Sequence, residues 1–271
     1  MLDYANDPLV YEQRIAASDT ESVALVEHQL VAQLAVSLGL LDVATVFLTL
    51  PTNLVMSGER LGDQPTATGF GVGDLGFGAR GTFYRGPKGG FGLQLTATLP
   101  TGEDAEGTPA VAGDAGATLE ATVLGELETG SLRISANAGM RLRKDVDLQV
   151  ASFGDLLTYG LALSVPVATV MGEPLRASAE LYGSTPNGDV GRRVTSPLEA
   201  LLGATWRLDP RWTTGLAEGM GLTRGYGAPD VRVLAALSYS ADLKASDEAI
   251  EARPAAYPRD STPEREPSPV P

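Results

Sequence analysis

The stretch GELETGSLRISANAGMRLRK, residues 125–144, alternates apolar with charged or small residues almost without interruption. Such alternation is typical of β-strands, whose successive side chains point to opposite faces. A two-residue turn at Thr129-Gly130 predicts a hairpin in which Leu127 lies opposite Leu132 and Glu126 lies opposite Arg133. Opposite charges then meet across the two strands, which favours this register.

Period-two patterns of this kind extend over most of the chain. Most of these segments contain ten or more residues, whereas strands of soluble proteins usually have five or six. No segment of comparable length favours a helix. The predicted strands are 23–38, 43–56, 70–85, 91–100, 117–128, 131–144, 155–169, 175–184, 197–208, 212–223 and 230–241.

The connections between these strands alternate between short and long. Short turns are predicted at 39–42, 86–90, 129–130, 170–174 and 209–211, and longer polar loops at 57–69, 101–115, 145–154, 185–196 and 224–229. Outer-membrane barrels show this asymmetry, with short periplasmic turns and longer extracellular loops. A strand at 8–17, followed by a turn at 18–22, then brings the count to twelve and places both termini in the periplasm.

The sequence therefore predicts an all-β fold, an antiparallel up-and-down transmembrane β-barrel of about 12 strands over residues 1–242. Residues 243–271 hold six prolines and mixed charges with few apolar residues, which predicts a disordered linker or tail. A soluble β-sandwich is the alternative fold. Its core would need bulky interlocking side chains, whereas the apolar faces here are built from Ala, Val, Leu and Gly.

The cost of charge in lipid decides which face looks outward. An arginine on the lipid face at mid-depth costs about 2–4 kcal/mol, so the charges are expected to line the lumen. The predicted lumen charge network consists of Glu120, Glu126, Arg133, Arg141, Arg176, Glu180, Glu199, Arg207, Glu218 and Arg232. The predicted lipid-facing set consists of Leu93, Leu95, Leu119, Val123, Leu132, Ile134, Met140, Leu181, Val233 and Leu237. In 212–223 the pattern is less regular, since Leu216, Glu218 and Met220 share a parity.

Composition excludes several functions. A net charge of −14 argues against nucleic acid as a partner. One histidine and no cysteine leave no His-based metal site, triad or thiolate chemistry, so we expect no enzyme, no cofactor and no metal. The amino terminus lacks the basic and apolar regions of a secretory signal, which predicts either a cytoplasmic protein or a mature form with an added methionine.

Three local patterns carry structural interpretations. GVGDLG, residues 71–76, matches the dinucleotide motif GxGxxG but lies in a strand, where small residues would leave room for lumen side chains or relieve strand curvature. An acidic loop with Glu103, Asp104, Glu106 and Asp114 could attract divalent cations, although simple solvation is the favoured interpretation. Aromatic girdles are expected at both membrane interfaces, with Phe83, Phe91, Trp206, Trp212 and Tyr239 near the short turns and Phe153, Tyr159, Tyr182 and Tyr226 near the long loops.

The segments at 71–80, 95–104, 131–143, 157–167, 196–208 and 226–240 resemble the amino-terminal barrels of large multidomain outer-membrane proteins of the OmpA family. The resemblance spans residues 8–241. It implies an integral protein of the Gram-negative cell envelope. Peptidoglycan binding is implied only for domains that would follow the barrel and are not in this sequence.

The functional hypothesis from the sequence is a membrane anchor and surface-presenting cell-contact protein with a lumen filled by Glu/Arg pairs. Its partners would be outer-membrane lipid and lipopolysaccharide, with a surface or envelope protein as a further partner. The first alternative is a narrow porin-like channel for small solutes. The second is a soluble β-sandwich binding module.

Overall fold

The structure, a computed structural model, describes residues 1–16, 19–59, 68–102, 113–114, 116–148, 151–188, 190–192, 195–223, 225 and 227–241. Every regular element in these ranges is a β-strand. The strands are β1 (Leu2–Ala16), β2 (Asp19–Leu40), β3 (Ala44–Ser57), β4 (Gly71–Val72), β5 (Leu75–Gly86), β6 (Gly89–Leu99), β7 (Thr118–Thr129), β8 (Leu132–Leu142), β9 (Val146–Leu148), β10 (Ala151–Phe153), β11 (Leu156–Val170), β12 (Glu173–Pro186), β13 (Leu198–Arg207), β14 (Trp212–Thr223) and β15 (Val231–Tyr239).

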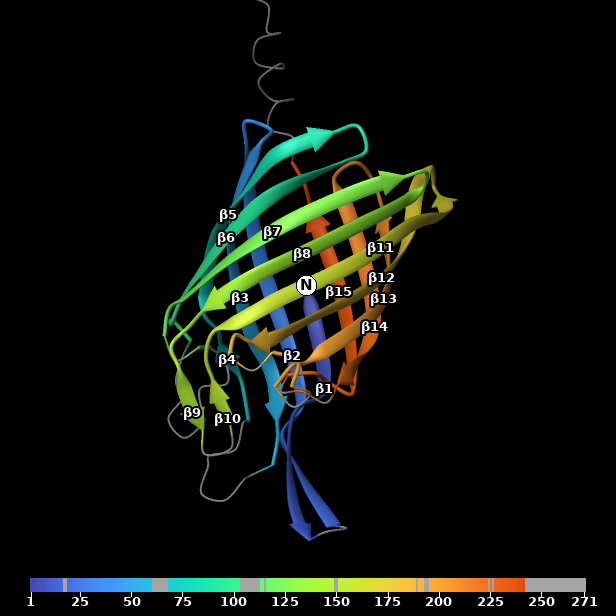
Figure 1. The fold of residues 1–271 in the computed structure, drawn as a ribbon. Helices are drawn as coiled ribbons and strands as arrows, with labels where there is room; N and C mark the ends of the chain where they lie inside the picture. Colours follow the sequence, from blue (N-terminus) through green and yellow to red (C-terminus); the bar gives the residue numbers. More distant parts are fainter. Residues whose placement is uncertain are drawn as a thin grey trace, which may run out of the picture.

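Twelve of these strands form one closed antiparallel β-barrel (Figure 1). Neighbours along the wall are also neighbours in sequence, and β1 closes the barrel by pairing with both β15 and β2. The short β4 adds to β3, and β9 and β10 form a separate hairpin inside a predicted loop. A single closed sheet confirms the predicted barrel and excludes the sandwich of two packed sheets.

Short turns lie at one end of the barrel and long connections at the other, as the sequence predicts. The β11–β12 turn consists of Met171 and Gly172, with φ of 53° and 84°. Two positive φ values in succession are characteristic of a type I′ turn, whose twist matches that of the strands it joins. These tight turns hold strand neighbours together without extra chain, and they define what we call the short-turn end.

The predicted register of the β7–β8 hairpin is wrong by two residues. Glu128, not Glu126, lies opposite Arg133, and Glu120 lies opposite Arg141. The turn residues are Gly130 and Ser131, with φ of 60° at Gly130. A turn at Thr129-Gly130 would force a positive φ on a β-branched threonine, which Gly130 in the first turn position avoids. A shift of two residues preserves every face, so only the partners change.

The first strand also differs from its prediction at 8–17. β1 begins at Leu2, and only Leu2–Asn6 pair with β15 in the barrel wall. Among the described residues, the remainder of β1 forms strand pairs with β2 alone, in a hairpin that projects beyond the barrel at the long-loop end (Figure 1). The segment that was expected to cross the membrane therefore lies largely outside the barrel wall.

The ten residues that the sequence predicts to face lipid share one face of the sheet. Cross-strand pairs such as Leu93 with Val123 and Leu161 with Leu181 place apolar side chains on the outside, and Val123 is 58% exposed. The small buried cluster of Val26 and Met56, with Leu9 against it, lies near the base of the projecting hairpin. The main apolar surface of the molecule is thus its outer wall.

Aromatic rings gather on this wall at the short-turn end. Trp212 and Tyr239 have ring centroids 5.0 Å apart, and Phe91 contacts both Phe83 and Tyr84. At the other end Tyr182 departs from its prediction, because it points into the lumen. The side chain of Phe153, all of Tyr226, the loop residues Glu103, Asp104 and Glu106, and the predicted tail at 243–271 lie outside what the structure describes.

None of the described residues form a helix long and apolar enough to cross a membrane.

Candidate functional site in the barrel lumen

The most buried charges of the lumen form a cluster around Arg232 on β15. Its guanidinium donates to Asp3 of β1 (2.6 Å) and to both carboxylate oxygens of Glu199 on β13 (2.8 and 3.2 Å). The Tyr182 hydroxyl donates to the same Glu199 carboxylate at 2.9 Å. The Arg232 side chain is 16% exposed and that of Glu199 is 7% exposed. Charges so removed from solvent depend on one another, since an isolated buried charge is costly.

Small residues on β14 allow this cluster to form. β14 lies between β13 and β15, and its lumen face at this level carries Ala217, Gly219 and Gly221. A Cβ at Gly219 would lie 2.3 Å from Leu201 Cδ2. Because this part of β14 carries no side chain larger than a methyl group, Arg232 can reach over it to Glu199.

A second cluster surrounds Glu120 on β7. Arg141 donates to its Oε2 from Nε (2.9 Å) and Nη2 (2.7 Å), and Thr158 donates to its Oε1 at 2.9 Å. Gly139 lies between these groups, and a Cβ there would be 2.7 Å from the Thr122 hydroxyl and 2.8 Å from that of Thr158. A glycine again permits polar side chains of three strands to converge.

The third cluster lies beside the short turn of the β7–β8 hairpin. Arg133 donates to Glu128 Oε1 from Nε (2.9 Å) and Nη2 (2.6 Å), and its Nε is 3.6 Å from Glu126. The side chains are about half exposed, with values of 43% for Arg133 and 46% for both glutamates. Water therefore screens this group far more than the Arg232 cluster.

Three other predicted lumen residues lie on the inner face without forming Glu/Arg pairs. Arg176 donates to the side chain and backbone oxygens of Ser164 at 3.0 and 3.1 Å. Glu180 accepts a long hydrogen bond from Ser178 at 3.4 Å. Arg207 lies opposite Thr213 near the short-turn end. The predicted network is thus divided into separate groups.

Glu218 is a correction, because its side chain lies on the outer face. It is opposite Leu202 on β13 and Val233 on β15, both of which face outward. The prediction assumed that every charge in a strand points inward. The shared parity of Leu216, Glu218 and Met220 was the signal for the observed arrangement.

Sequence reasoning missed several lumen residues. Asp3 was missed because the first strand was expected to begin at residue 8, and Tyr182 because tyrosines near strand ends are typical of girdles. Arg80 and Arg85 on β5 were not singled out either. The alternation of Leu2 and Tyr4 around Asp3 could have revealed Asp3 as an inward residue.

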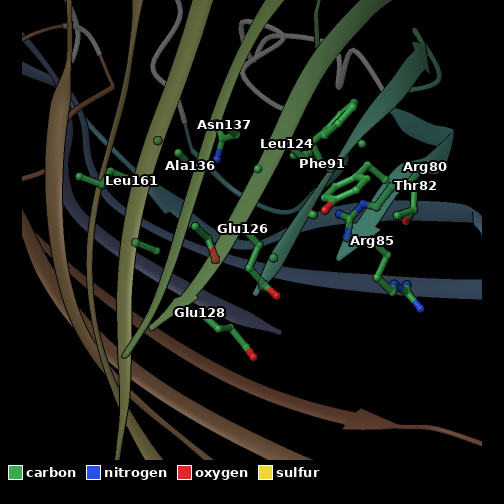
Figure 2. A pocket seen from close by; sticks show the side chains of 18 of the residues that line it. Arg80, Thr82, Arg85, Phe91, Leu124, Glu126, Glu128, Ala136, Asn137 and Leu161 are labelled. Carbon is green, nitrogen blue, oxygen red and sulfur yellow. The ribbon is translucent and has the colours of Figure 1, made fainter. Parts of the chain in front are cut away.

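The lumen contains substantial open volume toward the short-turn end. One cavity of about 860 Å³ is lined by Arg80 and Arg85 on one side and by Glu126 and Glu128 on another (Figure 2). Glu180 also lines this cavity. A second cavity of about 730 Å³ shares Arg80 and Arg85 with it. Both volumes are of the size that accommodates small molecules.

The ion pairs of the lumen follow the wall. In the described ranges, the pairs Arg133–Glu128, Arg141–Glu120 and Arg232–Asp3 each join adjacent strands. Arg232–Glu199 spans a single intervening strand. Each of these four pairs therefore joins near neighbours in the wall, and none of them reaches across the barrel to an opposite strand.

Hydrogen bonds and an ion pair hold the two ends of the acidic loop. Asp74 accepts backbone N–H bonds from Gly102 (3.0 Å) and Asp114 (2.7 Å), and Asp114 pairs with Arg143 at 3.4 Å. Among the described residues, no three acidic or histidine side chains form a group that could hold a metal ion. Asp74 and Arg143 thus fix the two ends of the loop.

Two glycines of the GVGDLG segment and its continuation, Gly76 and Gly78, lie under side chains of β3. A Cβ at Gly76 would meet the Thr49 hydroxyl at 2.3 Å, and one at Gly78 would meet the Phe47 ring at 2.5 Å. Gly71 and Val72 form β4, Gly73 and Asp74 lie between the strands, and Leu75 and Gly76 begin β5, so a strand and not a helix follows the motif. The structure thus agrees with the interpretation as space for neighbouring side chains at Gly76 and Gly78, whereas a Cβ at Gly81 would meet nothing within 4 Å.

Comparison with known proteins agrees with this fold. Residues 14–216 match the model of a family described as "Putative MetA-pathway of phenol degradation". The chain belongs to this family. No curated protein matches the chain.

Two solved structures are similar to the barrel. The COG4313 outer membrane channel from Pseudomonas putida F1 has a TM-score of 0.59 at 14% identity, over 88% of this chain and 94% of that one. The NanC porin in a rhombohedral crystal form has a TM-score of 0.53 at 10% identity, over 89% of this chain and 100% of that one. At these identities the likeness establishes the fold of an outer-membrane β-barrel, and the OmpA-family resemblance stays a prediction.

Proposed function

We propose that this chain is an outer-membrane channel through which small solutes pass along the lumen. The observation that carries the proposal is the open volume of about 860 Å³ in a lumen whose ion pairs follow the wall. Arginines and glutamates on different parts of this wall give a passing solute both hydrogen-bond donors and acceptors. The relatives in fold, described as a porin and an outer membrane channel, support the same function.

The proposal includes an orientation. With the short turns in the periplasm, the aromatic rings of Trp212 and Tyr239 lie at the inner interface of the outer membrane. The projecting β1–β2 hairpin then extends from the cell surface. Lipid contacts the apolar outer face, and lipopolysaccharide surrounds the long-loop end.

Liposome swelling tests the channel. Liposomes containing the purified chain should swell in isotonic solutions of small sugars and more slowly as sugar size increases. Ala162 lies on the lumen face, opposite Ser135 and Glu180. Ala162→Trp should therefore reduce the swelling rate severalfold. Leu163→Trp, one residue along on the outer face, is the matched control and should leave the rate unchanged. Equal rates for liposomes with and without the protein would refute the channel.

A second candidate function is the anchor and surface-presenting role that the sequence favours. The β1–β2 hairpin that projects past the barrel wall supports it, because it offers backbone edges at the long-loop end. Deletion of the hairpin tip, residues 11–22, should then abolish cell–cell contact while leaving liposome swelling intact. Loss of swelling with unchanged contact would favour the channel alone.

A further inference from the structure

The lumen face of β6 loses its side chains toward the short-turn end. Gln94 points into the lumen, where it binds Arg80. Because side chains alternate along a strand, Gly92 and Gly90 are the next two inward positions of β6. Both glycines line the cavity of about 860 Å³. A solute in this cavity therefore meets bare backbone at β6, and we call this part of the cavity the glycine hollow.

Two arginines of β5 lie on one side of the glycine hollow (Figure 2). Arg85 is opposite Gly90, and in the described part of the chain it makes no hydrogen bond or ion pair. Arg80 donates from Nε and Nη2 to Gln94 Oε1 at 3.0 and 2.8 Å. This amide holds the guanidinium in place without neutralising it. Both arginines thus keep a positive charge that is available to a solute.

Carboxylates lie on the other side of the glycine hollow. Glu126 on β7 is opposite Gly90 on the side away from β5. Its contact with Arg133 is 3.6 Å long, because that guanidinium directs its two short hydrogen bonds to Glu128. Glu180 on β12 also lines the cavity, and it accepts a hydrogen bond of 3.4 Å from a serine of its own strand. Glu126 and Glu180 thus keep most of their negative charge, whereas Glu128 is paired.

The opposite charges are held apart across the glycine hollow. Arg85, Gly90 and Glu126 form one row over three neighbouring strands, so the backbones of β5 and β7 are about 9–10 Å apart. In the buried cluster Arg232 reaches across one strand to Glu199 at 2.8 Å. In the described ranges no ion pair joins either arginine of β5 to a glutamate. Space therefore remains between the two kinds of charge.

We propose that the glycine hollow binds small zwitterionic solutes, with their carboxylate on Arg80 and Arg85 and their ammonium group on Glu126 and Glu180. The inference rests on the proposed channel and names its class of substrate. A guanidinium offers a carboxylate two parallel N–H donors, and an ammonium group donates to carboxylates. A simple anion gains the first contact but is repelled by the glutamates, and a simple cation is repelled by the arginines. A zwitterion gains both contacts, so the hollow should prefer it to either.

Protection of an engineered thiol tests this binding. The chain contains no cysteine, and Thr82, opposite Gly92, lines the cavity. The rate at which Thr82→Cys reacts with N-methylmaleimide, an uncharged reagent, is measured for the full chain in detergent micelles. The probes are γ-aminobutyrate, butyrate, butylammonium and butyramide at matched ionic strength, which share one carbon skeleton. γ-Aminobutyrate should slow the reaction severalfold and more than each of the others. Ala217→Cys, on the lumen face of β14 and not in the lining of this cavity, is the control and should react equally fast with every probe.

Charge variants in the Thr82→Cys background identify the two halves of the site. With Arg85→Gln, the protection by γ-aminobutyrate should fall to that by butylammonium. With Glu126→Gln, it should fall to that by butyrate. Neither change removes a short hydrogen bond or ion pair of the described structure, so both variants should fold. Arg207→Gln, a lumen arginine that does not line this cavity, is the matched control and should leave the protection unchanged.

Three results would overturn the proposal. Equal protection by butyramide and γ-aminobutyrate would show that the solute occupies the hollow by size alone. Protection by butyrate or butylammonium as strong as that by γ-aminobutyrate would identify a site for a single charge. Unchanged protection in both charge variants would place the binding elsewhere. Protection requires no current through the barrel, so its failure in a chain that conducts would refute the zwitterion site and leave the channel intact.

Discussion

Removal of the Arg232 guanidinium should destabilise the barrel strongly, because two carboxylates depend on it. Arg232→Met keeps the length of the side chain but leaves Asp3 and Glu199 without their cation. Glu199 is 7% exposed and Asp3 is 20% exposed, and one oxygen of Asp3 already lacks a hydrogen-bond partner among the described groups. Breaking a buried pair in this way costs about 3–5 kcal/mol, a large share of an ordinary folding stability of about 5–15 kcal/mol.

Urea unfolding of the refolded barrel, followed by the fluorescence of Trp206 and Trp212, measures this cost. With a slope of about 3 kcal/mol/M, the midpoint should fall by about 1 M or more. Arg133→Met is the matched control: its pair is about half exposed, so its loss should cost at most about 1 kcal/mol. Combining Arg232→Met with Asp3→Asn and Glu199→Gln should recover much of the loss. Equal small losses for Arg232→Met and Arg133→Met would refute the reasoning that burial couples the cluster.

Further predictions concern register, facing and selectivity. Charge reversal at Arg133 should be rescued by reversal of Glu128, its cross-strand partner, and less by reversal of Glu126, as measured by the same urea midpoints. Glu218→Leu should raise the urea midpoint, because it removes a charged side chain from the outer face of the barrel. The gain should be smaller than the about 2–4 kcal/mol that a lipid-facing arginine costs. A lower midpoint would show that Glu218 faces the lumen. Glu180→Gln should shift the reversal potential of the pore toward anions, because it removes a negative charge from the cavity wall, and an unchanged potential would exclude Glu180 from the ion path.

The faces of the strands could be predicted from the sequence because they depend only on parity. Leu119, Val123 and Leu237 lie outward as the alternation requires. The two-residue error in the β7–β8 register does not change the face on which any side chain lies. The ion-pair partners were less certain, since they depend on which residues form the turn. The position of Gly130 in the turn sets the partners. A glycine can occupy either central position of a two-residue turn, so its presence alone predicts the register only weakly.

The buried cluster could be predicted only in part. Glu199 and Arg232 were placed in the lumen, but their contact depends on Gly219 of a strand between them, which no pairwise pattern reveals. Asp3 belongs to the cluster because β1 begins at Leu2, whereas the predicted first strand begins at residue 8. Glu218 was placed wrongly because the cost of a carboxylate in lipid is smaller than that of an arginine, so an inward position was not compulsory.

Conductance in a planar lipid bilayer tests the central claim most directly. If the lumen conducts as proposed, the purified chain should produce steady unitary current steps. Ala162→Trp should make the steps smaller, and Leu163→Trp should not. Bilayers that contain the folded barrel and carry no current above that of the bare membrane would contradict the account.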